Sequence, residues 1–208
     1  MPVKQRILTI FVGGTYSSKE SETAELFDIV QSYTDKVFGI KTIHEWEGGN
    51  EEDSRIHGAI KLNQKLFDRV TPFQYDVINL IGFSHGGNIA IMALDELGLE
   101  RNSHGTTLPK LNLVTIATPA FVQYLEAAGR VQRFVNKWLN LYSRKDSVQN
   151  SLAGIGPYNR LVGNGRSYEL PLIRECEIKI PGKGRLTTHK ALPSNVYVID
   201  EIKTILSY

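Results

Sequence analysis

Cysteine is almost absent from this chain, which has Cys176 alone among 208 residues. One cysteine cannot form an internal disulfide, and no cysteine cluster is available to hold a structural zinc ion. The segment His44-Glu45-Trp46-Glu47 also lacks the second histidine of a zinc-binding helix. We therefore predict no metal site and a buried thiol. A single cysteine fits a reducing compartment, so we expect a cytoplasmic protein, with export by a specialised route left open.

Long apolar runs are also missing, and none approaches the ~20 residues that a membrane helix needs. The apolar run at residues 7–12 follows two basic residues, as a signal peptide would. It lacks a small-residue cleavage site and leads directly into Gly13-Gly14-Thr15. We interpret it as the first core strand of a protein without an integral membrane segment.

Neither sign of charge dominates, because the chain has 24 Lys and Arg and 22 Asp and Glu, which gives a net charge of +2. The basic residues are scattered and form no stripe with interleaved aromatics, which argues against a nucleic-acid partner. No phosphate-binding Gly-x-x-x-x-Gly-Lys-Ser/Thr segment occurs. A hydrophobic content of 41% is ordinary for a globular protein, and we predict one folded domain over residues 1–208.

Short apolar runs alternate with amphipathic stretches along the chain. This alternation predicts an α/β fold in which a mostly parallel central sheet is flanked by helices in a three-layer sandwich. The patterns predict strands at 7–12, 38–46, 77–81, 111–116, 138–142 and 176–180, and helices at 26–33, 53–70, 88–97 and 195–206. Residues 150–171 are rich in glycine and lack periodicity, so we expect a long loop there and a candidate lid.

The segment 82–87 reads Gly-Phe-Ser-His-Gly-Gly and lies between a predicted strand and a predicted helix. A strand, a tight turn and a helix around Gly-x-Ser-x-Gly are typical of a nucleophile elbow. Gly82 and Gly86 allow the backbone to turn sharply, so that Ser84 is held with its hydroxyl exposed. The alternative is a glycine-rich turn that binds a phosphate or only packs closely.

A nucleophilic serine needs a base, and in this architecture the chain order is serine, acid, histidine. The five histidines are His44, His57, His85, His104 and His189. The first two precede Ser84, His85 lies within the turn, and His104 precedes any credible acid. Only His189 remains, in a predicted loop between the last strand and the last helix. We predict that its imidazole takes the Ser84 proton and returns it to the leaving group.

The acid should lie between Ser84 and His189 in the sequence. Asp146 stands just past the carboxyl end of the predicted strand 138–142, where active-site side chains of parallel sheets gather. Its predicted role is to hold the His189 tautomer and stabilise the imidazolium that forms. The alternative is an ordinary surface-turn aspartate beside Lys145. Glu169 is the reserve candidate.

An oxyanion hole should combine the N–H of the residue after the nucleophile with an N–H from the loop after the first strand. These criteria select His85 and Thr15, with Gly14 as the alternative second donor. The glycines of this loop allow the backbone to approach a substrate closely. They would equally suit a turn with no catalytic part.

Taken together, these segments resemble the lipase and esterase branch of the α/β-hydrolase superfamily. The matching pieces are Val12-Gly13-Gly14-Thr15, the turn at 82–87, the stretch Tyr142 to Val148 and His189, and they span nearly the whole chain. The stretch 46–50, with Arg55 and Ala59, is also similar to a segment of bacterial lipase-like proteins.

The resemblance implies a minimal α/β-hydrolase fold without a large cap domain and without a metal or organic cofactor. It also implies hydrolysis of a small-molecule or lipid carboxylic ester through an acyl-serine intermediate. A thioesterase, amidase or acyltransferase would use the same triad, and the fold also hosts non-catalytic binding modules. The sequence leaves the natural substrate and the oligomeric state open.

Overall fold

Six parallel strands form one sheet in the order β2-β1-β3-β4-β5-β6. The structure, a computed structural model, describes residues 6–14, 39–44, 46–49, 51–70, 75–104, 108–149, 160–180, 185–193 and 195–206. The strands are β1 (Ile7–Val12), β2 (Gly39–His44), β3 (Val77–Phe83), β4 (Lys110–Ile116), β5 (Lys137–Tyr142) and β6 (Arg174–Glu177). The expected helix at 26–33 lies outside the described residues.

Both faces of the sheet are buried, which explains why the strands read as nearly continuous apolar runs. Along β3, for example, Ile78 and Leu80 belong to one hydrophobic cluster, whereas Ile81 and Phe83 belong to a second. Successive side chains of a strand point to opposite faces, so β1, β3, β4 and β5 each supply both clusters.

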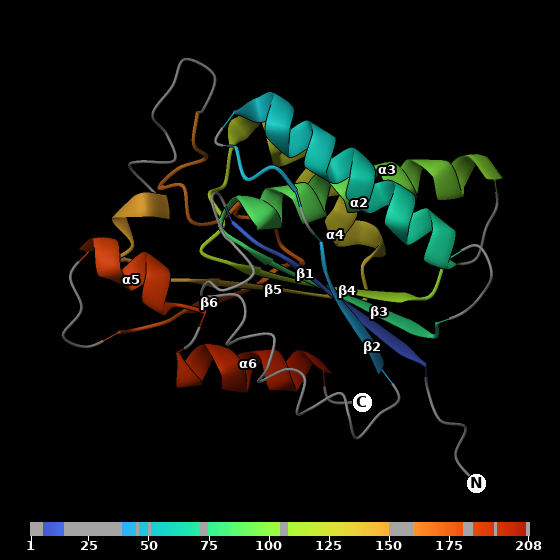
Figure 1. Ribbon diagram of the computed structural model, residues 1–208. Coiled ribbons are helices and arrows are strands. Elements are labelled where there is room, and N and C mark those ends of the chain that lie inside the picture. Colours follow the sequence, from blue (N-terminus) through green and yellow to red (C-terminus); the bar gives the residue numbers. More distant parts are fainter. Residues whose placement is uncertain are drawn as a thin grey trace, which may run out of the picture.

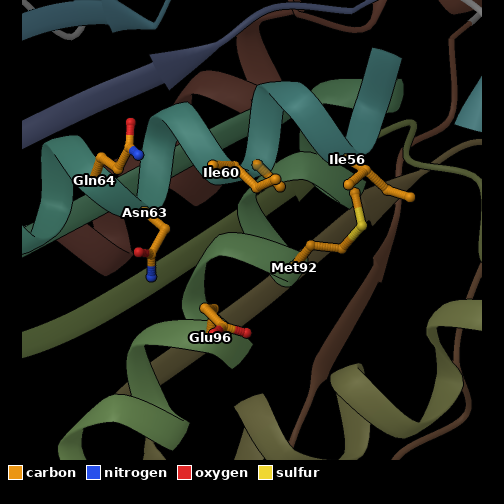
Figure 2. A pocket seen from close by; sticks show the side chains of 7 residues that line it. Ile56, Ile60, Asn63, Gln64, Met92 and Glu96 are labelled. Carbon is orange, nitrogen blue, oxygen red and sulfur yellow. The ribbon is translucent and has the colours of Figure 1, made fainter. Parts of the chain in front are cut away.

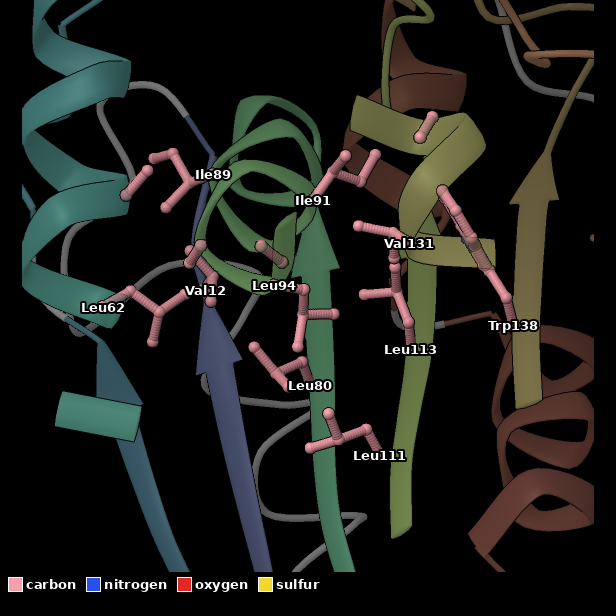
Figure 3. Packing of buried hydrophobic residues seen from close by; sticks show 14 of the residues in the cluster. Val12, Leu62, Leu80, Ile89, Ile91, Leu94, Leu111, Leu113, Val131 and Trp138 are labelled. Carbon is pink, nitrogen blue, oxygen red and sulfur yellow. The ribbon is translucent and has the colours of Figure 1, made fainter. Parts of the chain in front are cut away.

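Helices cover both faces of the sheet. The first cluster packs the strands against α2 (Glu52–Val70), α3 (His85–His104) and α4 (Leu125–Phe134), as Figure 3 shows for Leu62, Ile89 and Val131. The second packs them against α6 (Val196–Leu206) on the opposite face, while α5 (Arg185–Ala191) lies at one end of the sheet (Figure 1). The expected three-layer α/β architecture is confirmed.

The strand order reverses beside β1. The chain runs from β1 outward to β2, and then crosses back to β3 on the other side of β1. In open parallel sheets, a crevice forms at the carboxyl ends of the strands where the order reverses in this way. The segments that follow β1 and β3, residues 13–14 and Ser84, therefore leave the sheet side by side.

The last strand differs from the prediction. The apolar pattern at 176–180 predicted a strand there, but β6 covers Arg174–Glu177. Ile178 and Ile180 are buried in the cluster against α6 instead, so their apolar character reflects burial beyond the sheet. Cys176 within β6 is half-buried, not fully buried as expected, because this strand lies at the edge of the sheet.

Candidate active site

Ser84 is the single residue between the end of β3 and the start of α3. Its φ angle of 52° lies in the left-handed region, which residues other than glycine rarely adopt. The Ser84 amide donates a hydrogen bond of 2.8 Å to the carbonyl oxygen of Ile116 in β4. Strained backbone of this kind persists only where the surroundings hold it in place, and it is concentrated at functional sites.

The glycines flanking Ser84 are sterically required. A Cβ atom on Gly82 would lie 2.5 Å from the Gly87 Cα, and one on Gly86 would overlap the carbonyl oxygens of Val12 and Gly13. These neighbours are backbone atoms, which cannot move aside as a flexible side chain can. The turn therefore packs directly against the segment that follows β1.

The loop after β1 reaches Ser84 itself. A Cβ on Gly14 would lie 2.8 Å from the Ser84 Cβ and 3.3 Å from the Phe83 carbonyl oxygen. The backbone of Gly14 thus lies next to the candidate nucleophile, as an oxyanion-hole segment must. Thr15, the preferred second donor, lies outside the described residues, so its role stays a prediction.

Asp146 and His189 form a hydrogen-bonded pair, with 2.7 Å between Asp146 Oδ2 and His189 Nδ1. They come from the segment after β5 and from α5, which are 43 residues apart in the chain. The sequence prediction of a loop around His189 is wrong, because this residue lies within the short helix α5. The apolar periodicity of a helix of 7 residues is too brief to be distinguished from a loop pattern.

The Asp146 carboxylate is held at both oxygens. Its Oδ1 accepts hydrogen bonds from the amides of Val148 and Gln149, at 3.0 and 3.1 Å, while Oδ2 faces His189. Asp146 is completely buried. A carboxylate can only accept a hydrogen bond, so His189 Nδ1–H donates to Asp146 and leaves Nε2 as the ring nitrogen available for proton transfer.

His189 also lies close to the turn that carries Ser84. Its ring centroid is 5.0 Å from that of Phe83, the residue before Ser84. Ser84 and His189 retain 7% and 8% of their surface exposed, so both are enclosed without being sealed from solvent. The structure thus brings the Asp146 and His189 pair to the end of β3. The acid in contact with His189 is Asp146, not the reserve candidate Glu169.

His85 follows Ser84 and has a very different environment from His189. Burial, with smaller effects from the positive charge of Arg55 and from His189, lowers the pKa of His85 to about 3. Such an imidazole is neutral near pH 7 and too weakly basic to deprotonate a serine. Its backbone N–H, however, belongs to the first residue of α3 and has no acceptor within that helix.

Buried aromatic side chains and the guanidinium of Arg55 pack beside the turn that carries Ser84. The Phe121 ring stacks on His85 with centroids 5.7 Å apart, and the Arg55 guanidinium lies 5.2 Å from the Phe121 centroid. Arg55 Nε donates to the Tyr124 hydroxyl at 3.0 Å. Sequence reasoning missed Phe121 and Tyr124, since a 3-10 turn before α4 gives no pattern that separates them from other core aromatics.

Two further contacts tie together the loops around the site. Gln149 Nε2 donates to the Thr118 carbonyl at 2.7 Å, which joins the segments after β4 and β5. The Tyr168 hydroxyl donates to Asn88 Oδ1 at 3.0 Å and so reaches the first turn of α3. No short motif marks these partners, because each pair is brought together only by the fold.

Only part of the candidate lid, residues 150–171, is described by the structure. Its described part is attached to the segment after β4, because Val162 donates to the Ala120 carbonyl and Ala120 donates to the Gly165 carbonyl, at 2.7 and 2.8 Å. Residues 150–159 lie outside the described residues, and closure of a lid stays a prediction.

A groove of about 380 Å³ lies elsewhere, between α2 and α3. Figure 2 shows Ile56 and Ile60 of α2 facing it together with Met92 and Glu96 of α3. It contains none of the candidate catalytic residues.

Within the described residues no group of three or more His, Cys, Asp or Glu could hold a metal ion. Nor is any helix in that part of the chain long and apolar enough to span a membrane.

Comparison with known proteins extends the picture of the fold. No family model and no curated protein matches the sequence. Among solved structures, the product of gene lin2722 of Listeria innocua aligns with a TM-score of 0.61 at 12% identity, covering 97% of this chain and 94% of that one. A lipase-esterase related protein of Clostridium acetobutylicum aligns with a TM-score of 0.56 at 12% identity, covering 95% and 93%.

A cutinase-like protein of Cryptococcus sp. aligns with a TM-score of 0.53 at 13% identity, covering 95% of this chain and 90% of that one. At such low identity these likenesses concern the fold alone. The chain has an α/β-hydrolase-like fold with no large cap in its described part.

Proposed function

We propose that this protein is a serine hydrolase that cleaves carboxylic esters through an acyl-serine intermediate. The observation that carries the proposal is the placement of the hydrogen-bonded Asp146 and His189 at the end of β3, where Ser84 occupies a left-handed turn. The names of two structural neighbours, cutinase-like and lipase-esterase related, agree with this reaction class.

The first step uses His189 as a general base. Because Asp146 holds the proton on Nδ1, the Nε2 lone pair accepts the Ser84 hydroxyl proton as Oγ attacks the ester carbonyl carbon. The carbonyl π electrons move to oxygen and form a tetrahedral oxyanion. The buried carboxylate of Asp146 stabilises the imidazolium without itself taking the proton.

The oxyanion needs hydrogen-bond donors fixed before the reaction. We assign these to the His85 amide at the start of α3 and to the loop after β1, through Thr15 or Gly14. The partially positive N-terminus of α3 points to the same place and adds favourable electrostatics. Collapse of the intermediate breaks the bond to the alkoxy leaving group, which receives the proton from His189 Nε2.

The second half-reaction repeats these roles with water. His189 takes a proton from water, the resulting hydroxide attacks the acyl carbon, and Ser84 leaves with the proton that His189 returns. The products are a carboxylic acid and the free enzyme, so the protons balance over the cycle.

The test is hydrolysis of a short p-nitrophenyl ester by the wild-type protein and by Ser84→Ala. We expect turnover by the wild type and a fall of at least about a thousandfold in the variant, because the nucleophile is lost while the fold remains. Circular dichroism and the unfolding midpoint should match between the two proteins. Turnover retained by Ser84→Ala would refute the assignment of the nucleophile.

Failure of the folded wild type on ester, thioester and amide substrates alike would refute the hydrolase proposal and favour a binding module on the same fold.

A further inference from the structure

We propose that Trp46 is a positioning residue that holds the loop after β1 in the orientation required to bind the oxyanion. This inference rests on the proposed function and assigns a part to a side chain outside the triad and the oxyanion donors. Its basis is the hydrogen bond of 2.8 Å that the Trp46 indole Nε1–H donates to the Gly13 carbonyl oxygen.

Trp46 reaches the loop because β1 and β2 are neighbours in register. Val12, the last residue of β1, pairs with His44, the last residue of β2. The chain therefore leaves both strands at the same level, with Gly13 following one strand and Trp46 following the other. The indole spans the gap between the two segments.

Helix α2 fixes the position of Trp46 from the other side. A Cβ atom on Gly58 would lie only 3.3 Å from the Trp46 Cβ and 3.0 Å from Ile89 Cδ1, so the tryptophan packs directly on the helix backbone. The Gly58 carbonyl oxygen is 2.9 Å from His44 Nε2 and, because a carbonyl only accepts, receives a hydrogen bond from it. The Cβ end of Trp46 is thus held against α2, while its indole Nε1 is bonded to Gly13, and the two contacts give the side chain a defined direction.

The bond to Gly13 controls the amide of Gly14 through the geometry of the peptide unit. A trans peptide is planar, and its C=O and N–H point in opposite directions. Fixing the Gly13 oxygen therefore fixes the direction of the Gly14 N–H and the point from which the chain continues to Thr15. The Gly14 amide, one of the candidate donors for the oxyanion, therefore depends on this one peptide plane.

The same peptide unit is bounded by the turn around Ser84. A Cβ on Gly86 would overlap the Gly13 oxygen, and a Cβ on Gly14 would lie 2.8 Å from the Ser84 Cβ. Two consecutive glycines would otherwise sample a wide range of backbone conformations. The indole hydrogen bond restricts this range before substrate arrives, which is the condition for effective electrostatic stabilisation of a transition state.

The test compares Trp46→Phe with Trp138→Phe, the same substitution at the other tryptophan of the chain. Trp138 is buried in β5 and donates its indole N–H to Thr115 Oγ1 at 3.2 Å, so each variant loses one indole hydrogen bond. We expect Trp46→Phe to lower kcat for ester hydrolysis about tenfold with KM within about twofold of wild type. A misplaced donor weakens the hydrogen bond to the oxyanion of the transition state and leaves binding of the substrate unchanged.

Trp138→Phe should keep kcat within about twofold of the wild-type value. Equal kcat values for the two variants, or a loss in Trp46→Phe that appears in KM alone, would overturn the inference.

Hydrogen exchange separates this inference from the proposed function. In the peptide covering residues 7–14, we expect faster amide exchange in Trp46→Phe than in the wild type and no change in Trp138→Phe. Unchanged exchange in Trp46→Phe would overturn the positioning role whatever the activity. A wild type with no esterase activity would refute the proposed function, and the exchange result would then decide alone whether Trp46 orders the loop.

Discussion

Two regions of the molecule are built in different ways. One is the carboxyl edge, the side of the sheet on which the parallel strands end and where Ser84, Asp146 and Gly86 lie; the other is the helical layer formed by α2, α3 and α4. At the edge, Ser84 has a left-handed backbone, Asp146 is a completely buried carboxylate, and Gly86 leaves no room for a methyl group. The helical layer contains the groove between α2 and α3, where Ile56 and Ile60 are 40% and 50% exposed.

The comparison teaches that the groove between α2 and α3 and the candidate active site are separate places in this molecule. The groove offers volume and apolar contacts but none of the three residues that could act together on an ester. The edge combines a strained backbone at Ser84 with a buried carboxylate at Asp146, and both features cost stability. Such costs are expected where function has imposed them.

The largest difference between the two regions should appear in the free energy of unfolding when one methyl group is added in each. Gly86→Ala places a Cβ against the carbonyl oxygens of Val12 and Gly13, so we expect it to lower the free energy of unfolding by roughly 3 kcal/mol and to abolish esterase activity. Gly129→Ala is the matched control. Gly129 lies inside α4, where a Cβ would meet nothing within 4 Å.

We expect Gly129→Ala to raise the free energy of unfolding by about 0.5–1 kcal/mol, because alanine is a better helix former than glycine. Urea unfolding curves of the two variants and the wild type measure both changes. Similar effects of the two substitutions would contradict the account of a tightly fitted edge.

A smaller effect should appear in the pH dependence of stability. Burial lowers the pKa of His85 to about 3 in the folded protein, whereas an unfolded histidine titrates near its ordinary value of 6.5. As the pH falls below that value, the unfolded chain binds a proton that folded His85 refuses, so stability is lost. From pH 7 to pH 5 this histidine alone should remove up to about 2 kcal/mol.

His85→Gln should reduce that loss, whereas His57→Gln should leave it unchanged, because His57 is exposed on α2. Unfolding free energies of the three proteins at pH 7 and pH 5 provide the measurement. An unchanged pH dependence in His85→Gln would show that this imidazole is not held neutral by its surroundings.

Most of the fold could be predicted because its signals are local. The strand predicted at 7–12 coincides with β1, and the helix predicted at 53–70 begins one residue early, at Glu52. Apolar runs of buried parallel strands and helical periodicity over several turns are strong patterns. The short helix α5 and the displaced strand β6 could not be predicted, since brief segments carry too little periodicity.

The candidate site divides in the same way. Gly-x-Ser-x-Gly is a local motif with a steric reason for each glycine. The chain order serine, acid, histidine then selected His189 among five histidines and favoured Asp146 among the acidic residues. The contacts of Trp46 with Gly13 and of Phe121 with His85 join residues far apart in the sequence. Such pairs are consequences of topology, and no spacing rule in a single sequence identifies them.

The measurement that tests the central claim most directly is the rate of labelling by a fluorophosphonate, with the modified residue located by peptide mass spectrometry. Three proteins are compared: the wild type, Asp146→Asn at the edge and Glu96→Gln in the groove. We predict labelling of Ser84 at equal rates in the wild type and Glu96→Gln, and a rate lower by about a thousandfold or more in Asp146→Asn, where His189 loses its tautomer. A folded wild type that is not labelled at Ser84, or an Asp146→Asn variant labelled at the wild-type rate, would contradict the account.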